Sequence, residues 1–414
     1  MTSPGNRATP WDAIVVGAGP AGSATAALLA RGGLAVLILE KTVDGLPAKI
    51  CGEYLSPGCL PILRRLGALA SLSETGRPLY GMILRTASGR ILRASYASAP
   101  APPEERVHGL SLSRELLDPL LLDLAVKSGA EVESGFQVGD VRRDGQLVEV
   151  AGRLRGCAAC RSARLVIGAD GRHSAVARRL GAVRRHPWLD KMALVAYVTG
   201  VEREDARAEV FLAPDRYAIL NPMADGVTNV GVVATRRDLP RGEDPRRSLW
   251  ATATRMPGLD ARLRRARFSA SPRCVGPLAH RAAVLAARDT LLVGDAAGFL
   301  DPFTGEGIYA ALRSAELAAQ HVLANWTSAG AAPEAFAGYA RAWTQEFESK
   351  FRFATHLQRA IRHPALAEWL VAGLSRRSGL AATLLSAAGD LVPPRDLSLW
   401  RLARRAAGRP RSRG

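Results

Sequence analysis

The sequence predicts an α/β protein, α+β overall, in which a Rossmann-like domain carries an inserted, mainly antiparallel β-sheet domain and a C-terminal helical segment. Three observations lead to this prediction. A strand, a glycine-rich turn, a helix and a second strand open the chain, two later strand-to-helix turns repeat the pattern, and the segments between them alternate apolar and polar residues. The 414 residues exceed what one hydrophobic core usually supports, so about two domains are expected.

The first element is the stretch WDAIVVGAGPAGSATAALLARGGLAVLILEK, residues 11–41. Gly17 permits a tight turn, Gly19 lets the backbone approach a pyrophosphate, and Gly22 lets the helix pack closely on the strand. Glu40 ends the second strand, where a carboxylate that binds ribose is expected. Such an acid would repel a 2′-phosphate, so the predicted ligand is FAD or NAD rather than NADP.

Two further strand-to-helix turns follow. LVIGADGRHSAVARRLG, residues 165–181, contains Asp170 and Gly171 at its turn. DTLLVGDAAGFLDPFTGEGIYAALRSAELAA, residues 289–319, places Asp295 at a strand end and starts a long helix near Gly307. If the dinucleotide is FAD, Asp295 could accept a hydrogen bond from a ribityl hydroxyl, and a helix N-terminus at Gly307 would favour negative charge on the reduced ring.

In this order, the three motifs resemble those of the flavoprotein monooxygenase and geranylgeranyl reductase superfamily, and GDAAGFLDPFTGEGI is the most specific segment. The resemblance implies an FAD-binding domain of the glutathione-reductase type with FAD as the resident cofactor. It implies that Asp170 helps to hold the pyrophosphate, that Arg114 lies near the flavin, and that Lys49 lies along the FAD. The predicted FAD-binding residues are Gly17, Gly19, Pro20, Ala21, Gly22, Glu40, Lys41, Lys49, Arg114, Val138, Asp170, Gly171, Gly294, Asp295, Pro302, Gly305, Gly307 and Ile308.

No second GxGxxG motif occurs, so NAD(P)H is expected only as a transient electron donor in an open cleft. An electron-donor protein is the other donor considered. Cys157 and Cys160 form a lone CxxC, which we interpret as two cysteines near a hairpin end, because a zinc site needs a second ligand pair. No metal site is predicted.

The segment AKICGEYLSP, residues 48–57, resembles a Cys-Gly-Glu element of the geranylgeranyl reductase branch. This resemblance implies that Cys51 lies beside the flavin ring. There the thiol could donate a proton to a substrate carbon, or the small side chain could simply pack against the ring. Both roles stay open, and a disulfide with Cys59 is not favoured because no CxxxxC motif is present.

The motifs divide the chain into three parts. The FAD-binding domain is predicted to comprise residues 1–72, 106–182 and 277–330, and the substrate domain residues 73–105 and 183–276. Residues 331–414 are predicted to form helices with a basic tail.

Within the substrate domain, PDRYAILNP resembles the Pro-x-x-Tyr-x-Trp-x-Phe-Pro motif that lines a lipid tunnel in geranylgeranyl reductases. Pro214, Tyr217 and Pro222 match, and Tyr217 joins Cys51 as a candidate catalytic residue. Ile219 replaces the Trp and Asn221 the Phe. An amide there would lie unpaired against a prenyl chain, which argues against a purely isoprenoid substrate.

Net charge is +18, but only five of the 56 basic residues are Lys and the arginines are spread along the chain. No nucleic-acid partner is expected, because the basic segments lack interleaved aromatic residues. We interpret the apolar C-terminal segments as helices that cover the FAD-binding domain, followed by a basic tail, and a peripheral contact with an anionic membrane is the alternative. Five unevenly spaced cysteines, no signal peptide and no apolar run of about 18 residues predict a cytoplasmic protein, with membrane association as the further expectation.

The leading functional prediction is an FAD-dependent oxidoreductase that reduces or oxidises a carbon–carbon bond of a hydrophobic lipid, isoprenoid or polyketide-like substrate. The alternative is an NAD(P)H- and O2-dependent monooxygenase that hydroxylates an aromatic or quinoid compound. A non-catalytic flavin-binding protein is a third interpretation, which the complete GDAAGFLDPFTGEGI segment disfavours. Halogenation is not predicted, because the Trp-x-Trp-x-Ile-Pro motif of the related flavin halogenases does not occur in this sequence.

Overall fold

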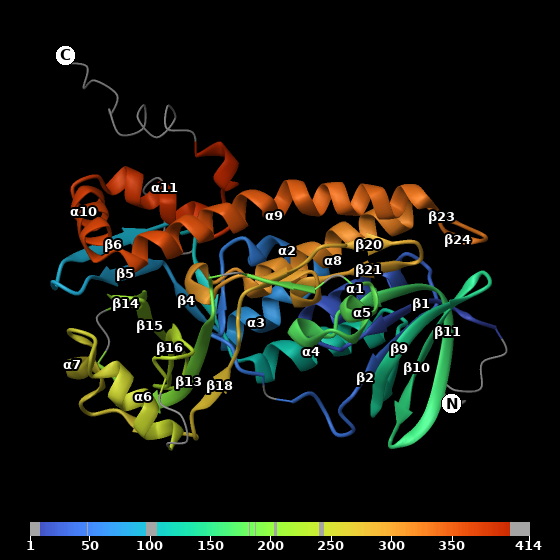
Figure 1. The fold of residues 1–414 in the computed structure, drawn as a ribbon, viewed down its shortest axis with the longest axis horizontal. Coiled ribbons are helices and arrows are strands. Elements are labelled where there is room, and N and C mark those ends of the chain that lie inside the picture. Colours follow the sequence, from blue (N-terminus) through green and yellow to red (C-terminus); the bar gives the residue numbers. More distant parts are fainter. Residues whose placement is uncertain are drawn as a thin grey trace, which may run out of the picture.

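The computed structural model describes residues 9–47, 49–96, 106–181, 183–186, 188–202, 205–239 and 244–397. The predicted basic tail from Arg401 lies outside these residues. Two large sheets and a layer of helices account for most of the described chain (Figure 1). None of the described helices is long and apolar enough to cross a membrane.

The first sheet has a parallel core that matches the predicted Rossmann-like domain. Its main path runs β20–β21–β11–β1–β2–β8. Val15 pairs with Ile167 on one side and with Ile38 on the other, both in parallel register. The strands are β1 Trp11–Val16, β2 Val36–Glu40, β8 Glu131–Ser134, β11 Cys157–Gly168, β20 Ala286–Ala287 and β21 Thr290–Leu292, and the antiparallel strands β9 Phe136–Asp144 and β10 Leu147–Leu154 extend β11.

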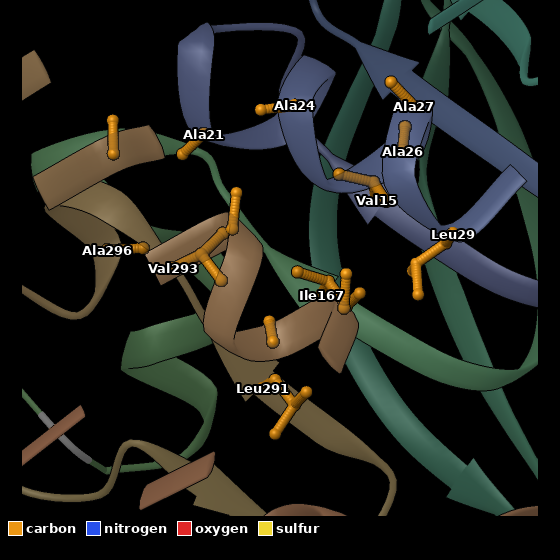
Figure 2. Packing of buried hydrophobic residues seen from close by; sticks show 14 of the residues in the cluster. Val15, Ala21, Ala24, Ala26, Ala27, Leu29, Ile167, Leu291, Val293 and Ala296 are labelled. Atoms are coloured by element: carbon orange, nitrogen blue, oxygen red, sulfur yellow. The ribbon is translucent and has the colours of Figure 1, made fainter. Parts of the chain in front are cut away.

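Helices pack on this sheet because its strands are apolar on both faces, as is usual for parallel sheets. Helix α1 (Pro20–Arg31) packs against α4 (Arg114–Lys127) and α8 (Gly307–Ala324). Figure 2 shows the resulting core, in which Val15, Ile167 and Leu291 from three strands share one cluster with Ala24 and Leu29 of α1. The remaining helices of this part are α2 Cys59–Leu66, α3 Leu69–Thr75 and α5 Ala175–Arg179.

The second large sheet is built from both predicted insertions. Its order is β17–β13–β16–β15–β14–β5–β6, with β18 beside β13. All its pairings are antiparallel except β14 with β5, which is where the two insertions join. The strands are β5 Gly81–Arg85, β6 Ile91–Ser95, β13 Lys191–Thr199, β14 Ala208–Ala213, β15 Arg216–Pro222, β16 Thr228–Thr235, β17 Arg267–Phe268 and β18 Arg273–Val275, and helices α6 Pro245–Ala253 and α7 Leu259–Leu263 pack beside them.

Small sheets connect the two large ones. β3 (Tyr54–Leu55) and β4 (Arg77–Leu79) both pair with β7 (Gly109–Ser111). The other small sheet joins β12 Val183–Arg185, β19 His280–Ala282 and β22 Gly298–Phe299, and a two-stranded ribbon is formed by β23 Trp326–Thr327 and β24 Gly330–Ala331.

The C-terminal part is helical, as predicted. Helix α9 (Pro333–Arg362) runs along α8, and α10 (Pro364–Ser375) and α11 (Ser378–Ala388) lie over β6 (Figure 1). A buried ion pair anchors this part, because Lys350 Nζ of α9 lies 2.5 Å from Asp390 Oδ1. Ser56 Oγ donates to the other Asp390 oxygen at 2.6 Å, which ties the segment after α11 to the first domain.

Candidate active site

The glycine-rich turn between β1 and α1 leaves space for backbone groups only. Gly17 has φ +101°, and a Cβ there would lie 2.7 Å from the Ala169 oxygen. A Cβ on Gly22 would lie 1.9 Å from the Gly17 oxygen. Gly19 precedes α1 and leaves the N-terminus of the helix without a side-chain cap, so its first N–H groups are free to meet a pyrophosphate.

Glu40 closes this turn from the end of β2. Its Oε2 accepts a hydrogen bond from Ala18 N at 2.9 Å, and its Oε1 accepts from Thr42 N at 3.1 Å and Thr42 Oγ1 at 2.8 Å. Burial raises the pKa of Glu40, but these hydrogen bonds outweigh that effect and hold the pKa below its ordinary value. The carboxylate is therefore ionised and keeps acceptor capacity for ribose hydroxyls.

Lys49 provides positive charge beside the turn, since its Nζ lies 3.0 Å from where a Gly19 Cβ would be. Burial and the nearby Arg114 charge lower the pKa of Lys49, while Asp118, Glu40 and Asp295 oppose that change. An anion bound at the turn would therefore stabilise the charged form of this lysine. The structure thus brings together Gly19, Lys49 and Glu40 as predicted site residues.

The other two motifs meet the same turn. Gly171 adopts φ +76° beside Asp170, whose Oδ2 accepts from Ala175 N at 2.7 Å. Asp170 Oδ1 is buried and has no hydrogen-bond partner within the described residues. Gly294 lies against α1, because a Cβ there would be 2.7 Å from the Ala21 Cβ.

We call residues 301–307 the flavin-edge loop. It begins with Asp301 and runs through the short helix η5 (Pro302–Thr304) to Gly305, which adopts φ +71°. Glu306 then precedes α8 without capping it, so the N–H groups of the first turn at Gly307 and Ile308 are not taken by a side chain. Asp295 is half-buried in the preceding short helix η4 (Gly294–Ala296).

Arg114 is the first residue of α4 and lies in a buried ion pair. Its Nε and Nη2 donate to Asp118 Oδ1 and Oδ2 at 2.5 and 2.6 Å. Its backbone N donates to Glu53 Oε1 at 3.0 Å. The Arg114 charge also acts on the Cys51 thiol and opposes the increase in pKa that burial causes, which places the predicted flavin arginine near the predicted reactive cysteine.

The Cys51 loop, residues 49–53, is held from the substrate sheet. Asn229 Nδ2 of β16 donates to Cys51 O at 2.9 Å. Asn221 Nδ2 of β15 donates to Gly52 O at 2.8 Å and Glu53 O at 3.0 Å. Sequence reasoning missed the role of both asparagines.

This contact corrects the interpretation of Asn221. The side chain is 1% exposed and its amide N–H groups bind protein carbonyls, so they are not left unpaired against a substrate chain. Of the side-chain polar atoms of Asn221, Oδ1 is the one that lacks a hydrogen-bond partner within the described residues. The N–H groups of Asn221 therefore give no argument against an apolar substrate.

The surroundings of Cys51 keep its thiol protonated. Burial raises the pKa of Cys51, and the Arg114 charge and the Glu53 N–H, which donates to Sγ at 3.3 Å, offset only part of that increase. Glu53 is 1% exposed, and burial raises its pKa as well, despite the hydrogen bonds that its Oε1 accepts from Ser113 Oγ and Arg114 N. At neutral pH the site thus presents a thiol rather than a thiolate.

Tyr217 is fully buried in β15. Its hydroxyl donates to Asp301 Oδ1, and that oxygen also accepts from Phe303 N at 2.9 Å and from Gln358 Nε2 at 2.7 Å. Gln358 Oε1 in turn accepts from Lys191 Nζ at 2.5 Å. This placement favours a role for Tyr217 in positioning the flavin-edge loop over the catalytic role predicted from the sequence.

The remaining predicted residues are more dispersed. Pro20 begins α1, Val138 is half-buried in β9, and Lys41 is exposed just after β2. Cys157 and Cys160 are free and exposed at the start of β11, next to the turn from β10, as expected for a hairpin end.

A family model described as FAD binding domain matches residues 11–342. The chain therefore belongs to this family. The residues fit the cofactor: a glycine turn that a Cβ would fill, two helix N-termini without side-chain caps, and an unpaired buried Asp170 oxygen. The protein is an FAD-dependent oxidoreductase, as predicted.

Its relatives include both reductases and halogenases. The chain is 27% identical to a menaquinone reductase of Mycolicibacterium smegmatis, over 96% of this chain and 97% of the relative. It is 29% identical to digeranylgeranylglycerophospholipid reductase 1 of Methanothermobacter thermautotrophicus, over 75% of this chain and 77% of the relative. Both matches agree with the predicted resemblance to geranylgeranyl reductases, while halogenases among the sequence relatives leave the specific reaction open.

Among solved structures, a triple mutant of the flavin-dependent brominase Bmp2 superposes with a TM-score of 0.79 at 19% identity, covering 95% of this chain and 98% of the brominase. At this identity the likeness shows the fold. It supports the predicted combination of a Rossmann-like domain with an inserted antiparallel sheet.

Proposed function

We propose that the protein reduces a carbon–carbon double bond of a hydrophobic substrate, with Cys51 as the proton donor. The observation that carries this proposal is the placement of the Cys51 loop, which is held to Arg114 of the FAD-binding part through Glu53 and to the substrate sheet through Asn221 and Asn229. Reduced FAD, when bound, supplies the hydride. The reductases among the relatives support the substrate class.

The residues of the chain account for the proton that the second carbon of the double bond receives. As the hydride reaches one carbon of the double bond, the other carbon takes the proton of the Cys51 Sγ–H, and the π bond is replaced by two C–H bonds. The resulting thiolate lies beside the Arg114 guanidinium, which stabilises it until solvent returns a proton. Because burial keeps the pKa of Cys51 above its ordinary value, the donor is loaded at neutral pH.

The electron donor for FAD is proposed to be NAD(P)H, bound transiently, because the only GxGxxG turn is the one expected to hold FAD. Stopped-flow reduction by NADH and by NADPH tests this, and failure of both would favour an electron-donor protein.

Oxygen-dependent chemistry is the second candidate, favoured by the similarity of the fold to a brominase. One experiment separates the two. Photoreduced enzyme is mixed without oxygen with a short-chain menaquinone or a geranylgeranyl lipid in deuterium oxide. Reduction predicts a product with two deuterium atoms added across the carbon–carbon double bond, because the N5 hydrogen of photoreduced flavin and the hydrogen of the Cys51 thiol both exchange with solvent. No anaerobic product, but an oxygen-18 atom or a halogen in the product after air is admitted, would contradict the proposal.

Variants then test the donor. Cys51→Ser should retain FAD but lower single-turnover reduction by about 100-fold or more, in the range typical of a lost general acid. Cys274→Ser, an exposed free cysteine on β18, is the matched control and should leave the rate unchanged. Equal rates in both variants would exclude Cys51 as the proton donor.

A further inference from the structure

Helix α10 exposes large apolar side chains. Trp369 is 71% exposed and Leu366 is 42% exposed, and they lie three residues apart on one face of the helix. Among the twelve residues of α10, only Ala367 and Val371 are buried. An apolar helix with so few buried residues indicates that its exposed face is an interaction surface.

The opposite face of α10 is fixed to the protein. Val371 packs in one cluster with Leu92 and Ala94 of β6. Glu368, the single acidic residue of α10, turns inward, where its Oε2 accepts from Thr86 Oγ1 at 2.9 Å and from Ser88 Oγ at 2.6 Å. The exposed face is therefore oriented by the fold and carries no acidic group of α10.

Arginines precede and follow α10 in the chain. Arg359 and Arg362 precede α10. Their guanidinium carbons lie 5.8 and 5.4 Å from the centroid of the Trp188 ring. Both arginines line a pocket of about 410 Å³. Arg362 also pairs with Asp215 at 3.3 Å and stays 44% exposed. Arg376 and Arg377 follow α10 and are both exposed.

An apolar stripe bearing a tryptophan, with arginines at each end, matches the interface of an anionic lipid bilayer. We propose that α10 docks on such a surface, with Trp369 and Leu366 in the headgroup region and the flanking arginines on lipid phosphates. The net charge of +18 complements the negative surface.

The position of α10 relative to the candidate site relates the proposed membrane contact to the supply of an apolar substrate. Ala367 on the inner face belongs to the same buried cluster as Tyr217, and Phe303 and Ile50 pack against that cluster. The helix therefore separates the proposed bilayer surface from the loops around Cys51 and the flavin edge. An apolar substrate taken from the membrane would therefore be delivered on the side of the molecule where α10 contacts this cluster.

Vesicle sedimentation of the FAD-loaded full chain tests the proposal without turnover, so its outcome does not depend on the proposed reaction. The protein should bind vesicles of phosphatidylcholine with phosphatidylglycerol, and bind more weakly to phosphatidylcholine alone or at high salt. Leu366→Ser/Trp369→Ser should weaken binding to the anionic vesicles by roughly tenfold or more, because two apolar side chains no longer leave water.

A matched control removes exposed apolar side chains elsewhere. Val126→Ser/Val183→Ser alters residues that are 48% and 41% exposed on α4 and β12, and it should bind vesicles like the wild type. FAD content and unfolding midpoint confirm that both double variants are folded. Equal loss in both, no loss in the α10 variant, or a dimer that the α10 variant converts to monomer in size-exclusion chromatography would overturn the proposal.

Discussion

Replacing Asn221 with Leu should release the Cys51 loop. The substitution removes the donors to Gly52 O, in a partly buried hydrogen bond, and to Glu53 O, in a buried one, and a carbonyl left unsatisfied costs about 1–3 kcal/mol, with the higher cost at the buried Glu53 O. It also removes Asn221 Oδ1, a buried acceptor without a hydrogen-bond partner within the described residues, and this removal offsets roughly the cost of one unsatisfied carbonyl. The net expectation is a loss of about 2 kcal/mol of free energy in the attachment of the loop, equivalent to about 30-fold in its opening equilibrium.

Thiol labelling measures that opening directly. In a background of Cys157→Ser, Cys160→Ser and Cys274→Ser, the free thiols that remain are Cys51 and Cys59, and Cys59 is fully buried. When the loop opens and closes faster than the reagent reacts, the labelling rate of Cys51 follows the opening equilibrium of the loop. Asn221→Leu should then raise this rate by about 30-fold. Peptide mass spectrometry assigns the labelled site.

Asn325→Leu provides the control. Asn325 Nδ2 donates at 2.8 Å to His321 O near the end of α8, so the same substitution removes a hydrogen bond far along the chain from the Cys51 loop. It should leave Cys51 labelling unchanged. If Asn221→Leu leaves labelling unchanged as well, the asparagine does not hold the loop, and the reasoning from its two contacts is refuted.

Three further predictions concern the cofactor and the buried charges. Asp295→Ala should lower FAD occupancy, because a predicted ribityl acceptor is lost, and absorbance of flavin released by heat measures this. Burial, reinforced by the Asp390 charge, raises the pKa of Glu306 to about 7, so the folded state holds a proton that the unfolded state releases above about pH 4.5. Stability should therefore fall between about pH 4.5 and 7, and Glu306→Gln should flatten the pH dependence of the unfolding midpoint; an unchanged dependence would contradict this. Lys350→Met leaves Asp390 buried without its cation and should cost about 3–5 kcal/mol in chemical denaturation, whereas a loss below about 1 kcal/mol would show that the pair is not stabilising.

The elements around the cofactor could be predicted because their signals are local. Gly17, Gly19 and Gly22 meet steric demands of one turn, and the strand before and the helix after it lie within the same stretch of chain. The helix predicted to start near Gly307 starts there.

The contacts between the domains could not be predicted in this way. Asn221 reaches carbonyls that precede it by 168 and 169 residues, and its direction depends on the register of β15 between β14 and β16. From the sequence, a polar residue in place of an aromatic one indicated a changed pocket, whereas its amide fastens a distant loop. Gln358 is similar, because nothing in an amphipathic helix indicates that one of its amides will meet Asp301.

The order of strands in the first sheet bears on how the protein is made. β1 is translated before the other described strands of this sheet but lies between β2 and β11, and β21 joins the sheet only after residue 290 has been synthesised. The flavin-edge loop is synthesised still later, and the hydrogen bond from Gln358 to its Asp301 can form only after residue 358 has been added. A nascent chain therefore exposes an incomplete dinucleotide turn while the inserted domain folds, and such delayed, long-range pairing is slow and prone to aggregation. Supply of flavin during expression should consequently act late, on nearly complete chains, and determine how much of the protein escapes aggregation.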